Sequence, residues 1–164
     1  MRPGAILLNG PSSSGKSTLA AALRQLIRKT RGESCRIVSL DDYLPMSPDE
    51  PIEEDDVYAV QPQLCAAVTE SLAAGCWLII DHVMTSERIH RQLMDALSGV
   101  SLLTVRVTCS RQALIDRERA RGDRCPGSAE ASLQYLYPRD GYDLTVDTTS
   151  LTANENAGII LSAM

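Results

Sequence analysis

The chain has 164 residues, a size typical of one domain, so we expect residues 1–164 to form a single globular unit. Its hydrophobic fraction of 44% suffices for a continuous core, and its charged fraction is 23%. The formal net charge of −5 argues against nucleic acid or an anionic membrane as the partner, because both need clustered positive charge, and it favours a small molecule.

Short apolar runs alternate with stretches of helical periodicity along the chain. This alternation predicts an α/β protein with a parallel sheet that is covered by helices on both faces. The expected elements, in chain order, are a strand over residues 5–8, a helix over 17–31, a strand over 35–40, a helix over 61–74, a strand over 76–80, a helix over 86–97, a strand over 102–107, helices over 111–121 and 128–136, a strand over 143–146 and a helix over 152–163. Residues 44–56 are rich in proline and acid and are expected to form a solvated loop.

The strongest local signal follows the first strand. Residues 10–17 match the pattern G-x-x-x-x-G-K-[ST] between an apolar strand and a helix, which is the context that gives this pattern meaning. In such a loop, backbone N–H groups and the helix N-terminus surround phosphate oxygens, Lys16 reaches the β- and γ-phosphates of ATP, and the Ser17 hydroxyl binds Mg²⁺. The residues expected to bind ATP here are Gly10, Pro11, Ser12, Ser13, Ser14, Gly15, Lys16, Ser17 and Thr18.

Acidic residues follow two of the expected strands. Asp81 ends the apolar run over 76–80, at the edge where parallel sheets bind ligands. We expect it to hold Mg²⁺ through water or to contact the acceptor, the molecule whose hydroxyl group would receive the phosphate. Asp41 and Asp42 follow the strand over 35–40 at the same edge, where a carboxylate can accept or orient the proton of an attacking hydroxyl. Asp41 is the first candidate because it directly follows the strand, and Asp42 is the alternative.

Four arginines gather near the end of the helix over 111–121 and in the turn beyond it: Arg117, Arg119, Arg121 and Arg124. Arg117 and Arg121 are one helical turn apart and share a face, whereas Arg119 points elsewhere. Next to a phosphate loop, such cations stabilise charge on the γ-phosphate and stack on adenine; we assign Arg121 and Arg124 to the first role and Arg117 to the second. The alternative is that they complement the dipole at the helix C-terminus.

These motifs resemble those of chloramphenicol phosphotransferase and its relatives among P-loop kinases, in order and at matching intervals. The matching segments are residues 6–10, the Ser-Ser-x-Gly-Lys-Ser sequence of the loop, residues 79–81, Arg117-x-x-x-Arg121-Gly-Asp-Arg124 and residues 146–149. The resemblance covers most of the chain.

The resemblance implies a P-loop kinase fold with a five-stranded parallel sheet and an arginine-bearing lid. It also implies ATP-dependent transfer of phosphate, with Mg²⁺, to a primary hydroxyl of an antibiotic. For single residues it implies Asp41 as the catalytic carboxylate, Arg121 and Arg124 as lid arginines, and Thr148 with Thr149 near the nucleotide base.

Two features depart from the family pattern, both beside the expected acceptor pocket. His82 stands where a second acid is expected, and residues 48–56 are unusually acidic. Together with Asp41, Tyr43 and Asp81, His82 completes the set of residues expected at the acceptor. If the acidic segment covers that pocket, its carboxylates favour a cationic or polyhydroxylated acceptor; otherwise it is a solvated loop.

Two other functions are compatible with the sequence. A nucleoside, nucleotide or metabolite kinase would use the same mechanism on a different acceptor, and Asp41-Asp42-Tyr43 also resembles uridine and pantothenate kinases. A nucleotide-dependent binding switch of the GTPase kind is disfavoured, because the chain has no Asn-Lys-x-Asp sequence to read guanine. The sequence does not predict an oligomeric state.

The five cysteines form no CxxC pair, and three of them lie in or beside apolar runs. They are expected to be reduced thiols and not a disulfide framework or a zinc site. No apolar run approaches the roughly 18 residues of a membrane helix, and residues 5–8 are too few for the apolar part of a signal peptide. We therefore expect a cytoplasmic protein with no membrane partner.

Replacing Lys16 with alanine tests the phosphate-loop assignment. The variant should keep its fold, while turnover with ATP and Mg²⁺ should fall by about 100-fold or more, because the transferred phosphate loses a positioned cation. Steady-state kinetics measures the loss, and circular dichroism checks the fold. A folded variant with near-normal turnover would contradict the assignment.

Overall fold

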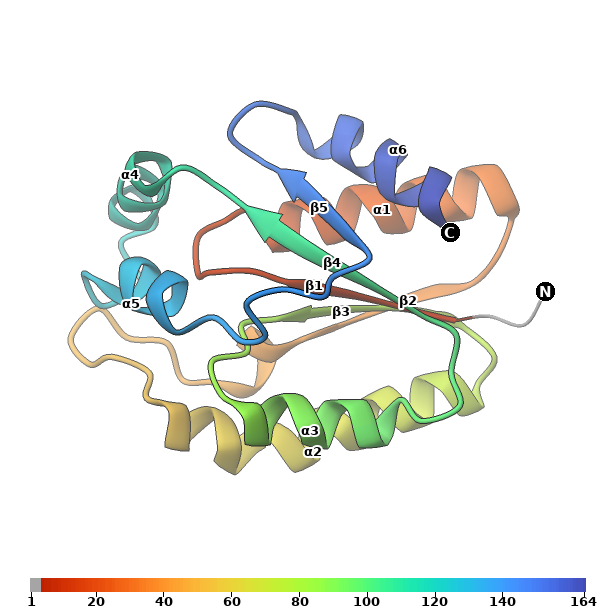
Figure 1. Cartoon of the computed structure of the whole chain (residues 1–164), viewed down its shortest axis with the longest axis horizontal. Helices are drawn as coiled ribbons and strands as arrows, with labels where there is room; N and C mark the ends of the chain where they lie inside the picture. Colours follow the sequence, from red (N-terminus) through yellow and green to blue (C-terminus); the bar gives the residue numbers. More distant parts are fainter. Residues whose placement is uncertain (1–3) are drawn as a thin grey trace.

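The structure of the chain is a computed structural model that describes residues 4–164 (Figure 1). Its centre is a sheet of five strands, β1 (Ala5–Asn9), β2 (Cys35–Ser39), β3 (Trp77–His82), β4 (Leu102–Thr108) and β5 (Leu144–Asp147). They pair in the order β2-β3-β1-β4-β5, and every pairing is parallel. The predicted five-stranded parallel sheet is therefore confirmed.

Helices cover both faces of the sheet, as the alternation of patterns predicts. They are α1 (Lys16–Arg31), α2 (Glu54–Ala73), α3 (Glu87–Ala96), α4 (Arg111–Arg121), α5 (Ser128–Tyr135) and α6 (Ala153–Ala163). In Figure 1, α1 and α6 lie side by side above the sheet, α2 and α3 lie below it, and α4 and α5 lie beyond the carboxyl ends of the strands. Between residues 4 and 164, no helix is long and apolar enough to cross a membrane.

The sheet separates two layers of core side chains, because successive residues of a strand point to opposite faces. In β3, Leu78 and Ile80 pack with the core under α2 and α3, whereas Ile79 packs with the core under α1 and α6. Both β1 and β3 are buried along their whole length, as central parallel strands are. The same alternation sends Asp81 and His82, at the end of β3, into opposite layers.

Helix α2 begins earlier than the sequence indicates. The prediction placed its start near residue 61, after a loop, but the helix starts at Glu54 and has Pro62 inside it at an exposed position. The reason is a capping box, in which Glu53 accepts a hydrogen bond from the backbone N–H of Asp56 and the Asp56 carboxylate accepts one from the Glu53 N–H. Acids in the first turn also interact favourably with the helix dipole. Part of the expected acidic loop is therefore a helix start.

A buried asparagine joins the end of the central strand to two loops. Asn9, the last residue of β1, is fully buried. Its Oδ1 accepts a hydrogen bond from the Met84 N–H at 2.9 Å, and its Nδ2 donates to the Tyr137 carbonyl at 3.0 Å and to the Tyr142 hydroxyl at 2.8 Å. These bonds fix the loop after β3 and the loop before β5 relative to β1.

Candidate active site

Residues 10–17 wrap around the start of α1, as the motif predicts. Gly10 is required by packing, because a Cβ at this position would lie 2.5 Å from the carbonyl oxygen of Val107 in β4. Gly15 directly precedes α1 and has a φ of 90°, in the left-handed region that favours glycine. The first turn of a helix has backbone N–H groups without helical partners, and such groups bind phosphate.

The polar side chains at the start of α1 are held by nearby groups. Lys16 is 6% exposed, and its Nζ donates a hydrogen bond to the Pro11 carbonyl at 2.8 Å. Burial lowers the pKa of Lys16 from its ordinary value of 10.5, and the carboxylates of Asp81 and Asp41 oppose that effect. The Ser17 hydroxyl donates to Asp81 Oδ2 at 2.8 Å, so the two groups expected at the metal ion are in contact.

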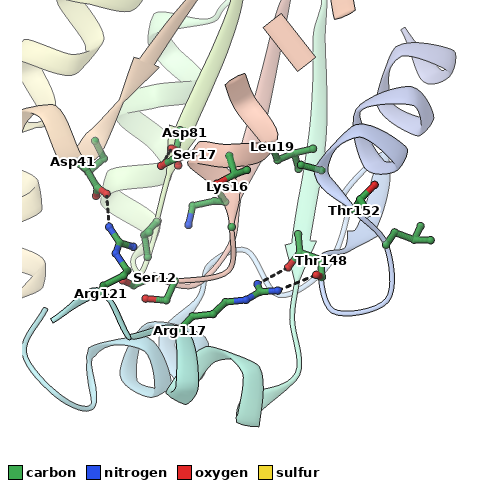
Figure 2. Close-up of a pocket in the computed structure, with 17 residues that line it drawn as sticks. Ser12, Lys16, Ser17, Leu19, Asp41, Asp81, Arg117, Arg121, Thr148 and Thr152 are labelled. Atoms are coloured by element: carbon green, nitrogen blue, oxygen red, sulfur yellow. Dashed lines mark hydrogen bonds and ion pairs between the residues drawn. The ribbon is translucent and has the colours of Figure 1, made fainter. Parts of the chain in front are cut away.

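A cavity of about 550 Å³, the loop cavity, opens beside the phosphate loop (Figure 2). Figure 2 shows Lys16 near the middle of the surrounding side chains, with Asp41 and Arg121 on one side and Arg117 and Thr148 on the other. The predicted residues that line it are Ser12, Ser13, Gly15, Lys16, Ser17, Thr18, Asp41, Asp81, Arg117, Arg121 and Thr148. The structure thus brings most of the expected nucleotide-binding residues to one cavity.

A second cavity of about 660 Å³, the α2 cavity, is lined by residues from the start of α2 and from α5. Ser12, Leu40, Asp41 and Val83 line both cavities, so the two are contiguous. Asp41 is the one ionisable residue of these four and therefore lies at the boundary. Asp42 is exposed and belongs to the lining of neither cavity.

The arginines reach this boundary from α4 and the loop after it. Arg124 Nη2 donates a hydrogen bond to Asp41 Oδ2 at 2.8 Å, and Arg121 Nη2 lies 3.9 Å from the same oxygen. The Arg124 side chain is only 7% exposed, although it belongs to a short connecting segment. Arg121 and Arg124, which are expected to contact the phosphate, therefore both face Asp41, which is expected to contact the acceptor hydroxyl.

Arg117 is anchored on the opposite side of the loop cavity. Its Nη2 donates to the Thr148 carbonyl at 2.9 Å, and its Nη1 donates to the Thr148 hydroxyl at 3.0 Å and to the Ser14 carbonyl at 3.3 Å (Figure 2). These bonds join α4, the phosphate loop and the segment after β5. The sequence places both Arg117 and Thr148 near the nucleotide base, and the structure adds a direct contact between their side chains.

The sequence matches the family described as chloramphenicol phosphotransferase-like protein over residues 4–164. The chain belongs to this family. Its members are P-loop phosphotransferases, and the chain is accordingly an ATP-dependent kinase. No curated protein sequence matches this chain significantly.

Solved structures of other proteins, two of them kinases, share the fold. The APS kinase of Mycobacterium tuberculosis, in complex with AMPPNP and APS, superposes with a TM-score of 0.75 at 16% identity, over 98% of this chain and 96% of that one. A gluconokinase from Sinorhizobium meliloti 1021 gives 0.68 at 24% identity, over 98% and 90%. The Deinococcus radiodurans tunicamycin resistance protein gives 0.68 at 19% identity, over 99% and 95%. At these identities the likeness establishes the fold alone.

The residues beside the phosphate loop fit a magnesium ion. Ser17 and Asp81 offer a hydroxyl and a carboxylate oxygen in direct contact, and the Ser39 hydroxyl lies 3.4 Å from the same Asp81 oxygen. Mg²⁺ prefers such oxygen ligands and takes its other positions from phosphates and water. Within residues 4–164, no group of three or more His, Cys, Asp or Glu side chains is placed to hold a metal ion.

His82, expected at the acceptor, is instead packed between the sheet and α2. It is fully buried and lines neither cavity. Gln61 Nε2 donates to the Ile89 carbonyl, so Gln61 Oε1 must accept from His82 Nε2, at 2.9 Å. Burial holds the pKa of His82 at about 3, below its ordinary value of 6.5, so the ring is neutral. Strand alternation explains this position, because Asp81 already points to the opposite layer.

Like Gly10, Pro11 and Ser14 of the phosphate loop, the predicted residues Tyr43 and Thr149 are not part of the lining of either cavity. Tyr43 is partly buried and packs against the core under α2. Thr149 is exposed, and its hydroxyl accepts a hydrogen bond from the Ser110 N–H at 2.8 Å, which braces the turn after β5.

The structure adds residues that no motif signals. Ser132 of α5 accepts a hydrogen bond from the Ser12 N–H at 2.9 Å, which links α5 directly to the phosphate loop. Tyr135, also on α5, lines the α2 cavity, and residues 151–153 line the loop cavity. Ser132 is 120 residues from Ser12 in the chain, so only the folded structure reveals this contact.

The neutral state of His82 predicts a specific dependence of stability on pH. Below pH 6.5 the unfolded chain binds a proton at this histidine that the folded chain does not, so stability falls as pH drops from about 6.5 toward 3. Between pH 7 and pH 5 the free energy of unfolding should fall by about 2 kcal/mol from this group. Urea unfolding at pH 7, 6 and 5 measures it.

The matched variant for this measurement is His82→Gln, which keeps a hydrogen-bonding side chain next to Gln61 and removes the titration. The difference in unfolding free energy between wild type and variant should shrink as pH falls from 7 to 5. A constant difference over this interval would show that His82 does not titrate with folding.

Proposed function

We propose that the chain moves the γ-phosphoryl group of ATP onto a hydroxyl group of an antibiotic, as a chloramphenicol 3-O-phosphotransferase-like enzyme that confers antibiotic resistance. The observation that carries this proposal is the position of Asp41 between two contiguous cavities, one beside the phosphate loop and one under α5. The second cavity, at about 660 Å³, lies within the range of roughly 300–1,000 Å³ that is typical of sites for drug-sized ligands.

On this proposal the loop cavity takes the nucleotide. The phosphates lie against the backbone N–H groups of the loop and the Lys16 ammonium. Ser17 and Asp81 would hold Mg²⁺, which would supply positive charge against the phosphate oxygens. The base lies near Arg117 and Thr148, whose mutual hydrogen bonds support a fixed, planar surface for stacking. Thr149 contributes by bracing the same turn.

The acceptor hydroxyl lies against Asp41, which accepts its proton as a general base or orients it. The hydroxyl oxygen bonds to the γ-phosphorus while the bond from that phosphorus to the bridging oxygen breaks, and ADP leaves with the electron pair. Lys16, Arg121 and Arg124 stabilise the charge that spreads over the transferred group. The arginines act from a lid formed by α4, α5 and the segment between them.

The chemistry of the α2 cavity supports an uncharged or cationic acceptor. Leu44, Met46 and Ile52 give it an apolar wall, and Glu50 and Glu53 add negative charge. Such a lining repels acceptors that already carry phosphate or sulfate. A hydroxylated antibiotic therefore fits better than a nucleotide, while an uncharged metabolite with a free hydroxyl is the second candidate.

Other carboxylates in the same lining are paired within the protein. Asp41 is paired with Arg124, and Arg88 Nε donates to Glu54 Oε1 at 2.7 Å. The bond from Arg88 holds the pKa of Glu54 at about 2. Glu53 is engaged in the capping box of α2, so Glu50 is the carboxylate that distinguishes acceptors by charge, and exchanging it alters the acceptor preference without a change at the phosphate loop.

We also propose that the enzyme acts in the cytoplasm. All five cysteines are free thiols in the structure, and two of them, Cys35 at the start of β2 and Cys76 just before β3, are buried. Free cysteines are typical of proteins in reducing compartments.

A direct experiment tests the reaction. The protein is incubated with ATP, Mg²⁺ and a panel of hydroxylated antibiotics and metabolites, and mass spectrometry detects products heavier by one phosphoryl group. Phosphorylation of an antibiotic supports the proposal, and phosphorylation of metabolites alone supports the second candidate. ATP and GTP binding measured side by side tests the remote alternative, a nucleotide-dependent switch, which would bind without transfer.

Asp41→Asn should lower kcat by about 10²- to 10⁴-fold, which is the usual contribution of a general base. The substitution keeps the size of the side chain and removes its charge, so the Kd for ATP should change little. Steady-state kinetics and calorimetric titration of the nucleotide give the two values.

Asp42→Asn is the matched control, because its carboxylate is adjacent in sequence but exposed and outside both cavities. Its kcat should stay within about twofold of wild type, as expected for a surface side chain. If Asp42→Asn is the damaging change and Asp41→Asn is not, the base has been assigned to the wrong carboxylate.

A further inference from the structure

Residues 122–127, the arginine loop, join α4 to α5, and both ends of this loop are hydrogen-bonded to Glu118. The Gly122 N–H donates to the Glu118 backbone oxygen at 3.4 Å, and the Gly127 N–H donates to Glu118 Oε2 at 3.0 Å. Glu118 Oε1 accepts a third hydrogen bond from the Ala129 N–H at 2.8 Å. Glu118 is buried, so the two bonds to its carboxylate and the one to its backbone oxygen fix the base of the loop.

Asp123 lies inside the arginine loop and contacts both arginines assigned to the phosphate. Arg124 Nη1 donates to Asp123 Oδ2 at 2.8 Å, and Arg121 Nε lies 3.5 Å from Asp123 Oδ1. The second terminal nitrogen of Arg124, Nη2, donates to Asp41 Oδ2 at 2.8 Å. The planar guanidinium of Arg124 is thus held on two sides by two carboxylates, which fixes its orientation.

This pair differs from an ordinary surface ion pair, which contributes little to stability. The Asp123 side chain is 56% exposed, but the Arg124 side chain is only 7% exposed. Arg124 is therefore enclosed by protein. The bond from its Nη1 to the Asp123 carboxylate sets the direction in which its Nη2 points. Arg121, Arg124, Asp41 and Asp123 together carry two positive and two negative charges, so the cluster is balanced before a nucleotide arrives.

We propose that Asp123 is a positioning residue for phosphoryl transfer: it fixes the Arg124 guanidinium so that the Nη2 edge faces the boundary between the loop cavity and the α2 cavity. Asp123 lines neither cavity, so it acts through Arg124 and not on a substrate. The inference rests on the proposed function, in which Arg124 stabilises the transferred phosphate at that boundary. Without Asp123, Arg124 keeps one carboxylate partner and loses its fixed plane.

The kinetic test is a double-mutant cycle with Asp123→Asn and Arg124→Ala. In the wild-type background, Asp123→Asn should lower kcat by about 10- to 100-fold, which is the cost of misplacing a catalytic group by roughly 1 Å. In the Arg124→Ala background the same substitution should change kcat by less than about twofold, because residues that act as a unit are not additive. The Kd for ATP should stay within about twofold, since Arg124 acts on the transition state. Asp123→Glu, which keeps the charge, should recover part of the loss.

Asp116→Asn is the matched control, because Asp116 is an exposed aspartate of α4 whose carboxylate contacts Gln112 and not an arginine. It should leave kcat unchanged in both backgrounds. Equal losses from Asp123→Asn in the two backgrounds, or a kcat loss matched by weaker ATP binding, would overturn the positioning role.

A measurement without substrates separates this inference from the proposed function. Nitrogen NMR of the ligand-free protein reports rotation of the Arg124 guanidinium: its two Nη signals should be separate in wild type and in Asp116→Asn, and should merge in Asp123→Asn. If wild type phosphorylates no acceptor but this difference is seen, the proposed function fails, while the role of Asp123 in fixing the Arg124 guanidinium is supported. If wild type is active and the signals are the same in all three proteins, the role of Asp123 is wrong.

Discussion

The side-chain amide of Asn9 joins the loop after β3 and the loop before β5 to the central strand. It is fully buried at the end of the central strand, directly before the phosphate loop, and all three of its hydrogen bonds go to other segments. Its contact with the Met84 N–H sets the position of Val83, which lines both cavities. A buried amide that lost these partners would keep its desolvation penalty without any hydrogen bond to offset it. Moving these loops away from β1 would therefore cost free energy.

Three cations of the site have hydrogen-bond partners within the protein. Lys16 donates to the Pro11 carbonyl, Arg117 to Thr148, and Arg124 to Asp41. A nucleotide that binds here would replace these internal hydrogen bonds with its own, and the side chains would already be ordered. Pre-organisation of this kind lowers the conformational cost of binding and leaves more of the interaction energy for the transition state.

The parts of the site that follow from local chemistry could be predicted from the sequence. The phosphate loop and the carboxylates at the strand ends depend on a motif or on the geometry of a parallel sheet. Strand alternation would also have separated His82 from Asp81, since neighbours in a strand face opposite layers.

Other features depend on partners that are distant in the chain. The Gln61 amide, which accepts a hydrogen bond from His82, is 21 residues from it in the chain, and Arg124 is 83 residues from its partner Asp41. The start of α2 does not follow from the sequence for a different reason: acids are common both in solvated loops and at helix N-termini, and only the reciprocal bonds of Glu53 and Asp56 decide between the two.

The two cavities have only four lining residues in common, and the walls of the α2 cavity come largely from the segment leading into α2 and from α5. If the α2 cavity holds the acceptor, as we propose, evolution can exchange two short stretches of chain, and with them the compound that is recognised, while the phosphate loop stays unchanged.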